Sequence, residues 1–226
     1  MGLLKLDYCG KTFSRGNTVI HAVRPTVMEI EAGVHLIYGR DGAGKSTLLH
    51  MMAGMEPPSD GKIYYEGASV YDALDLPSLY RQDFGFIFPE ENLIPEFNVG
   101  DNLLMPLRFN RDKERGLFHE LVEALELSDM LRMRPQSLSE YEQQRAAVAR
   151  ALLQRPKIVF ADDITCRLNE EERDQLMEVL LRLCAKQQVT LIAATNDAEL
   201  QQYGKTLYRM RDGELTVQHD AQGEEK

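Results

Sequence analysis

The chain has 226 residues, of which 36 are acidic and 26 are basic, so its formal net charge is −10. This length fits one domain with an inserted subdomain, and a hydrophobic content of 43% allows a sizeable core, which excludes a mainly disordered chain. The acidic balance excludes a general nucleic-acid binder, because such proteins present a basic surface. We therefore expect no nucleic acid among the partners.

The cysteines and the apolar runs indicate in which cellular compartment the protein is expected. Cys9, Cys166 and Cys184 are scattered and form no CxxC pair, which predicts reduced thiols and no zinc site. No run of 18 apolar residues is present, and the first apolar run is too short for a signal peptide, so no membrane span or leader is expected. These features predict a soluble cytoplasmic domain.

The first quarter of the chain has the pattern of strands followed by a βα unit. Residues 3–8 alternate apolar and polar side chains, and residues 18–30 are rich in β-branched residues, so both predict strands. Residues 34–38 form a short apolar run that ends at a glycine loop. Residues 45–53 then predict a helix, with Gly54 at the C′ position. Strand, glycine loop and helix in this order are typical of an α/β protein.

The middle of the chain changes from strands to helices. Residues 62–66, after the turn signal Asp60-Gly61, and residues 84–88 predict strands. Between residues 99 and 136 the leucine spacing predicts two helices, which suggests a helical insertion in the α/β core. A third helix is expected from Ser139 to about residue 154. The leucines that define the first two helices are Leu103, Leu104 and Leu107, and then Leu117, Leu121, Leu125 and Leu127.

The last third returns to alternating strands and helices. Residues 157–161 and 189–194 predict buried strands, and residues 170–186 predict a helix between them, an order that implies a parallel sheet. Residues 207–217 contain Asp212-Gly213, which predicts a hairpin turn.

One segment predicts a phosphate site. Residues 39–46 match G-x-x-x-x-G-K-[ST], in which glycines let backbone N–H groups surround phosphates. In this pattern Lys45 neutralises the β- and γ-phosphates and the Ser46 hydroxyl binds Mg²⁺, a cation that prefers oxygen ligands. The candidate nucleotide-binding residues are Gly39, Arg40, Asp41, Gly42, Ala43, Gly44, Lys45, Ser46 and Thr47.

A site of this kind needs a carboxylate on the magnesium side at the end of a buried strand. Residues 158–163 provide Asp162 as a ligand or outer partner of Mg²⁺, and Asp163 could polarise a water. Acidic residues after a strand can instead cap a helix, and this alternative stays open.

The segments, in this order, resemble the nucleotide-binding subunit of an ABC (ATP-binding cassette) transporter over nearly the whole chain. The stretch from residue 84 to residue 107 is most similar to the branch of lipoprotein-release, macrolide-export and peptide-resistance transporters. The residues that carry the family resemblance are Gly39 to Ser46 (Walker A), Ile158 to Asp163 (Walker B), and Leu138-Ser139, Gln143-Gln144-Arg145 and Ala149-Arg150-Ala151-Leu152 (the signature region).

This resemblance implies a fold and a set of partners. The fold is a P-loop NTPase with a RecA-like α/β core, an N-terminal antiparallel β subdomain and a helical subdomain at about residues 88–155, within one domain of residues 1–226. The cofactors are ATP and Mg²⁺. The partners are integral-membrane permease subunits and a second ATP-binding subunit, in a homodimer or heterodimer at the inner face of the plasma membrane.

The resemblance also implies roles for two further residues. Phe13 falls where the family places an aromatic residue that stacks on adenine, although a half-exposed strand aromatic is the alternative. Ser139, in the signature, would contact the nucleotide held by the other subunit.

The departures from the family pattern fall on catalytic elements. Glu140-Tyr141-Glu142 stands where the signature has Gly-Gly-Gln, although Ser139 and Glu142 still predict a capping box. Of the two catalytic candidates, Asp163 replaces a longer glutamate and Asn196 replaces a histidine. Pro89 replaces the Q-loop glutamine, and the D-loop has Cys166-Arg167-Leu168-Asn169. Because a base must lie close to its water, these changes predict slow or absent hydrolysis with ATP binding retained.

Three functions remain compatible with the sequence. The chain could be a transporter subunit that still cycles, or a degenerate ATP-binding partner of a second, competent ATPase chain. It could also be a regulator of cell-wall enzymes built on the same cassette. Carboxylates in the signature would repel a phosphate, and a homodimer would carry this defect at both sites, so the heterodimer is favoured.

Overall fold

The computed structural model describes residues 2–16, 18–90, 92–109 and 115–220. The chain forms two compact units: the first comprises residues 1–79 and 190–226, and the second comprises residues 80–189. Helix α2 (Leu76–Gln82) carries the chain from the first unit into the second. Within the described ranges, no helix is long and apolar enough to cross a membrane.

The first unit begins with an antiparallel sheet. Its register pairs Leu4 with Ile30 on one side and Leu4 with Tyr65 on the other. The first strand extends well beyond the predicted residue 8, and a bulge with Tyr8 at a φ of 50° bends it there. The strand order is β2-β1-β4-β5, with β1 (Leu4–Arg15), β2 (Thr18–Ile30), β4 (Asp60–Tyr65) and β5 (Ala68–Ser69).

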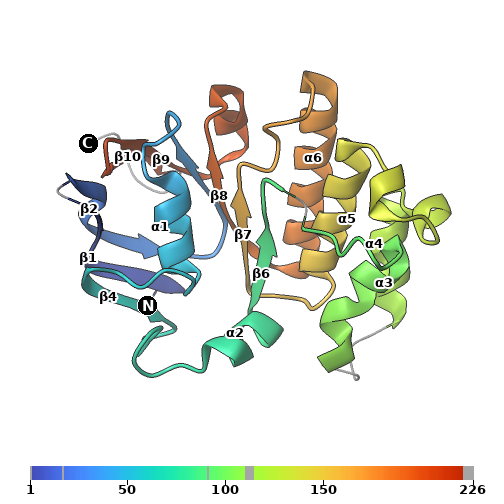
Figure 1. The fold of residues 1–226 in the computed structure, drawn as a ribbon, viewed down its shortest axis with the longest axis horizontal. Coiled ribbons are helices and arrows are strands. Elements are labelled where there is room, and N and C mark those ends of the chain that lie inside the picture. The colour runs from blue at the N-terminus through green and yellow to red at the C-terminus, as the bar shows by residue number, and fades with distance from the viewer. Residues whose placement is uncertain (1, 17, 91, 110–114, 221–226) are drawn as a thin grey trace. The chain divides into compact units, whose positions relative to one another are not determined.

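The same unit contains four strands in the order β10-β9-β3-β8 (Figure 1). Strand β3 is parallel to β8 and β9, whereas β10 returns antiparallel to β9. Helix α1 follows β3 directly, as the βα pattern predicted. The bounds are β3 (Val34–Tyr38), α1 (Lys45–Met52), β8 (Thr190–Thr195), a 3₁₀ helix η4 (Ala198–Tyr203), β9 (Thr206–Arg211) and β10 (Glu214–Asp220).

Two local turn predictions are confirmed in this unit. Gly54 follows α1 with a φ of 78°, a left-handed conformation that suits glycine at a helix C-terminus. Asp212 and Gly213 join β9 to β10 with φ values of 49° and 79°, as expected for a two-residue hairpin whose central residues both have positive φ. Asp60-Gly61, in contrast, is not a separate turn, because strand β4 already begins at Asp60.

The second unit combines a parallel strand pair with helices. Phe84 of one strand pairs with Ile158 of the other. Helix α5 packs against α3 and α6 (Figure 1). The elements are β6 (Phe84–Ile87), α3 (Val99–Leu104), η1 (Met105–Phe109), α4 (Arg115–Ala124), η2 (Ser128–Met130), η3 (Pro135–Ser137), α5 (Glu140–Leu152), β7 (Ile158–Asp162) and α6 (Glu170–Gln187).

Two of the predicted helices end earlier than their leucine spacing suggested. Helix α3 stops at Leu104, and the chain continues as the 3₁₀ helix η1. This helix contains Pro106, which lacks the backbone N–H that an α-helix needs. Helix α4 ends at Ala124, and Glu126 adopts a left-handed φ of 51°. Leu125, the first residue after the helix, is nevertheless buried in the hydrophobic core.

Buried amides hold the second unit together around β6 and α3. The Asn102 side chain is fully buried; its oxygen accepts from the Ile94 N–H at 2.6 Å, and its nitrogen donates to the carbonyl oxygens of Ile94 and Asn98 at 3.0 Å. The Gln154 amide donates to the Phe84 carbonyl at 2.9 Å. These bonds satisfy buried backbone groups that would otherwise destabilise the fold.

Candidate functional site

The phosphate loop lies between β3 and α1, and two of its glycines are required by close backbone contacts. A Cβ atom on Gly39 would lie 2.2 Å from the Met210 carbonyl oxygen, and one on Gly44 would lie 2.0 Å from the Ala22 carbonyl oxygen. Gly44 also has a φ of 104°. Neighbouring strands therefore fix the path of the loop, and only glycine fits at both of its ends.

Lys45 is the first residue of α1, and its side chain folds back under the loop. The residue is 6% exposed, and its Nζ donates to the Gly39 carbonyl oxygen at 2.9 Å and to the Arg40 carbonyl oxygen at 3.1 Å. A cation at this point stabilises the loop and lies within reach of any anion that the loop surrounds.

The N-terminus of α1 is suited to an anion. Gly44 is the N-cap and makes no side-chain capping bond, and the first turn contains no acidic residue. The helix does not itself use the N–H groups of its first turn, and its dipole places partial positive charge there. Ser46 is exposed in this first turn, where its hydroxyl can serve a hard cation. These features fit a magnesium-bound triphosphate.

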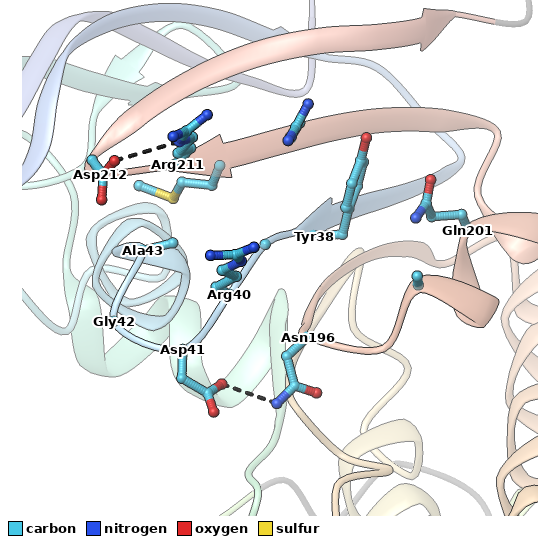
Figure 2. Close-up of a pocket in the computed structure, with 13 residues that line it drawn as sticks. Tyr38, Arg40, Asp41, Gly42, Ala43, Asn196, Gln201, Arg211 and Asp212 are labelled. Carbon is cyan, nitrogen blue, oxygen red and sulfur yellow. Dashed lines mark hydrogen bonds and ion pairs between the residues drawn. The ribbon is translucent and has the colours of Figure 1, made fainter.

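Asn196 joins this site from the end of β8. Its Nδ2 donates to Asp41 Oδ1 of the loop at 2.9 Å, so this catalytic candidate is bound to the loop through a neutral amide (Figure 2). The two residues line a cavity of about 430 Å³ on one side of the loop, together with Gly39, Arg40, Gly42, Ala43 and seven residues from β3, η4, β9 and the hairpin turn: Tyr38, Ala198, Gln201, Arg209, Met210, Arg211 and Asp212.

Phe13 lies on β1 and is 39% exposed. Lys11 Nζ lies 5.1 Å from the centre of its ring, a cation–π arrangement. The cavity beside the loop contains no part of Phe13 among its described lining residues. The adenine role of Phe13 therefore stays a prediction.

Asp162 and Asp163 belong to the second unit, at the end of β7. Asp162 is the last residue of the strand and is 4% exposed, while Asp163 follows with a left-handed φ of 46°. The alternative that these residues cap the next helix is wrong, because the N-cap of α6 is Asn169, which forms a capping box with Glu172. Aspartate is among the non-glycine residues that adopt this left-handed conformation most readily.

The signature helix of the second unit closes its own N-terminus. The Ser139 hydroxyl accepts from the Glu142 N–H at 3.2 Å, and Glu142 Oε2 accepts from the Ser139 N–H at 2.7 Å. The predicted capping box is therefore confirmed, and Glu140 and Glu142 both lie in the first turn of α5. These carboxylates offset the positive end of the helix.

Tyr141, which stands at a glycine position of the family, makes contacts that no glycine could make. Its ring lies over the Arg145 guanidinium at 4.7 Å, and its hydroxyl donates to Gln175 Oε1 at 3.2 Å. Burial raises the pKa of the Tyr141 hydroxyl. Arg145 is 7% exposed and pairs with Glu126 at 2.8 Å, so the first turns of α5 are fixed to the turn that follows α4 and, through Gln175, to α6.

A glycine loop between a parallel strand and a helix, with a buried lysine at the start of that helix, defines a P-loop NTPase. The model of the ABC transporter family matches residues 24–166. The chain therefore belongs to the ABC transporter family. It resembles the ATP-binding subunits of the lipoprotein-release and macrolide-export branch, as its sequence predicted.

Individual relatives agree with this assignment. The lipoprotein-releasing system ATP-binding protein LolD of Bdellovibrio bacteriovorus is 34% identical over 212 residues, which cover 90% of this chain and 96% of LolD. The macrolide export ATP-binding/permease protein MacB of the same organism is 32% identical over 90% of this chain, but the match spans only 32% of MacB. A dimeric structure of the ATP-binding cassette MJ0796, bound to ADP and Pi, superimposes with a TM-score of 0.86 at 29% identity and covers 97% of this chain and 99% of that one.

The structure brings some of the predicted site residues together within the first unit. Residues 39–43 and Asn196 line one cavity there, and Lys45, Ser46 and Thr47 follow at the start of α1. Ser139, Asp162 and Asp163 belong to the second unit. The arginines of β9 that line the cavity were missed, because no motif marks them. Their alternation, with Arg209 and Arg211 exposed on one face of a strand, was the available signal.

Proposed function

We propose that this chain binds Mg-ATP as the cassette subunit of a membrane transporter and hydrolyses it slowly. Residues 39–47 would hold the triphosphate, Ser46 and Asp162 would hold Mg²⁺, and Phe13 would support the adenine. When bound, Mg²⁺ neutralises charge on the β- and γ-phosphates. Lys45 adds a fixed cation, and the first turn of α1 adds backbone donors. Helices α3 to α5 would form the helical subdomain at about residues 88–155.

The observation that carries the slow hydrolysis is the closed N-terminus of α5. The Ser139 hydroxyl and the Glu142 N–H bind each other within the chain, and two carboxylates occupy the first turn. A carboxylate 4 to 6 Å from a phosphate costs on the order of a few kcal/mol at an effective dielectric constant near 20. This signature would therefore bind the ATP held by a second subunit only weakly.

The residues nearest the reaction support the same proposal. Asp163 is shorter than a glutamate by one methylene group, so its carboxylate would reach a water less well. Asn196 cannot titrate, and its amide donates to Asp41. A group engaged in this way is a weaker ligand for a γ-phosphate than a histidine that faces it.

Pairing with a second, competent cassette would remove part of the proposed defect in ATP hydrolysis. Its intact signature would complete the ATP site on this chain's loop, while this chain's signature would leave the other site weak. We therefore propose a heterodimer with another ATP-binding subunit, attached to integral-membrane permease subunits at the inner face of the plasma membrane. The dimer of the cassette MJ0796 supports pairing of cassettes in general.

The first test compares nucleotide binding with turnover in the purified full chain. We expect Mg-ATP to bind tightly and phosphate release to be near background. The double variant Asp163→Glu, Asn196→His should raise turnover at least tenfold without tightening binding. Asp197→Asn serves as a matched control beside the site. No gain from the double variant would contradict the assignment of the defect to these residues.

The second test identifies the partner. The full chain is captured from native membranes, and mass spectrometry measures the copy number of each subunit. One copy of this chain with one copy of a different cassette supports the heterodimer. Two copies of this chain with permease subunits and no other cassette would exclude it.

A further inference from the structure

A second cavity is formed wholly by residues of the second unit. Its volume is about 470 Å³, and it is lined by the turn after α4, the first turns of α5 and the middle of α6, three helices of this unit (Figure 1). Among its described lining residues are none of the candidate nucleotide, magnesium or catalytic residues. The cavity is therefore a different place from the proposed ATP site.

One wall of this cavity is the side chain of Tyr141, which replaces a glycine of the family signature. Its ring lies over the Arg145 guanidinium at 4.7 Å, and its hydroxyl donates to Gln175 Oε1 at 3.2 Å, so the ring is held between α5 and α6. A glycine has no side chain that could form this wall. The cavity is thus tied to a departure of this chain from the family pattern.

Four charged side chains line the cavity, two of each sign. Arg145, which is 7% exposed, pairs with Glu126 at 2.8 Å. Within the described ranges, the exposed side chains of Glu178 and Arg182 make no ion pair or hydrogen bond, although their i, i+4 spacing on α6 would allow them to pair. One carboxylate and one guanidinium group are therefore available to a ligand in the cavity.

We propose that this cavity binds a small zwitterion, an α-amino acid with an apolar side chain. Arg182 would bind its carboxylate through paired N–H donors, and Glu178 would accept hydrogen bonds from its ammonium group. A ligand with a single charge would leave one of these two groups without a partner. The balanced pair therefore favours a zwitterion over a simple acid or amine.

The remaining walls suit the apolar part of such a ligand. Leu125 and Val179 line the cavity together with the ring of Tyr141. A few charged groups that fix orientation, set among apolar walls, are typical of sites for small organic ligands, and the volume lies in their range. Because Tyr141 belongs to the first turn of α5, a bound amino acid would also stabilise the start of the signature helix.

The test uses L-leucine as the probe and the full chain, without nucleotide, as the sample. We expect saturable leucine binding at a single site in calorimetry. Isocaproate, which has the same carbon chain without the ammonium group, and isoamylamine, which lacks the carboxylate, should each bind at least tenfold more weakly. This difference is expected because hydrogen bonds to charged groups are stronger than those between neutral groups.

Variants of the lining residues locate the site. Arg182→Gln and Glu178→Gln should each weaken leucine binding at least tenfold, while Tyr141→Phe, which keeps the ring, should change it less than threefold. Arg132→Gln is the control, because this arginine is exposed on the same unit and is not among the lining residues. It should alter leucine binding less than twofold. The melting temperature of every variant is measured, so that a misfolded protein is recognised.

The outcomes also separate this inference from the proposed function. Absence of saturable leucine binding by the wild-type chain would overturn the inference, as would equal leucine binding by wild type, Arg182→Gln and Glu178→Gln. Isocaproate that bound as tightly as leucine would overturn it too, since the ammonium group would then contribute nothing. Mg-ATP affinity is measured separately, and failure of Mg-ATP to bind would contradict the proposed function while the leucine result still supported the cavity.

Discussion

Two helix N-termini in this molecule have opposite chemistry. Helix α1 begins after Gly44, without a side-chain cap and without an acidic residue in its first turn. Helix α5 begins after Ser139, with a complete capping box and with Glu140 and Glu142 in its first turn. Both ends have the same backbone dipole, so their side chains alone decide whether each end attracts or repels an anion.

The difference shows that stability and ligand binding compete for the same backbone donors. At α5 the donors are used by Ser139, which stabilises the helix by about 1 kcal/mol. Helix α1 has no side-chain cap. The loop before it is held instead by close contacts with neighbouring strands and by the hydrogen bonds of Lys45. Under the proposed function, Glu140 and Tyr141 would favour the helix over the glycines that they replace and would weaken phosphate binding at its end.

The largest effect is expected from the backbone of the loop. Gly44→Ala places a Cβ atom 2.0 Å from the Ala22 carbonyl oxygen at a φ of 104°, and should lower the free energy of unfolding by more than about 3 kcal/mol. Gly42→Ala is the matched control, because Gly42 also has a positive φ, 74°, but a Cβ there meets no atom within 4 Å. It should cost about 1 kcal/mol. Urea denaturation measures both, and equal losses would contradict the packing argument.

Lys45→Ala should act on nucleotide binding more than on folding. The variant removes a cation that donates to two loop carbonyls and faces the expected triphosphate. Hydrogen bonds to charged groups contribute about 1.5 to 3 kcal/mol, so Mg-ATP affinity should fall about 100-fold in calorimetry. Lys62→Ala, at an exposed ion pair with Asp72 in the same unit, should leave affinity unchanged. Wild-type affinity in the Lys45 variant would mean that the triphosphate lies elsewhere.

Restoring the family glycines should weaken the signature helix. Glu140→Gly with Tyr141→Gly removes the ring over Arg145 and the hydroxyl bond to Gln175, and adds two flexible residues to the first turn of α5. The combined loss of stability should be about 2 kcal/mol. Tyr141→Phe is the control, since it keeps the ring and should cost less than about 1 kcal/mol in thermal or urea unfolding.

If the double glycine variant proved as stable as wild type, the contacts of Tyr141 would contribute nothing to the folded state. The comparison of the two helix ends would then lose its thermodynamic basis, because α5 would have gained nothing from the lost glycines. Lower stability of the double glycine variant, together with faster ATP turnover when it is mixed with a competent cassette, would support the contrast between the two helix N-termini.

Much of this fold follows from local sequence rules. The strand over residues 18–30, the strand before the loop, the helix after it and the hairpin at Asp212 are all confirmed by the structure. Each depends on hydrophobic periodicity or on a turn residue, which act over a few neighbours. The capping box at Ser139 was predicted for the same reason.

Other features were not predictable because they depend on contacts distant in the chain. Asn196 meets Asp41 across 155 positions, and Arg209 lines a cavity with Arg40. Strand pairing brings these residues together: Tyr38, which precedes the loop, is in register with Thr195 on one side and with Arg209 on the other. The sequence predicted that residues 39–46 form a loop for phosphates, but no local rule states which side chains from other strands surround it.

The smallest effect is expected from a single hydroxyl, and it isolates the cap itself. Ser139→Ala removes the acceptor for the Glu142 N–H and should lower the free energy of unfolding by about 1 kcal/mol. Ser137→Ala, two residues earlier in η3 and exposed, is the matched control and should change stability by less than about 0.5 kcal/mol. Equal stability of the two variants would mean that Glu140 and Glu142 stabilise the end of α5 through charge alone, so that the hydroxyl contributes nothing. A loss confined to Ser139→Ala would place the stabilisation in the hydrogen bond, which is the contact that competes with a phosphate for the same donor.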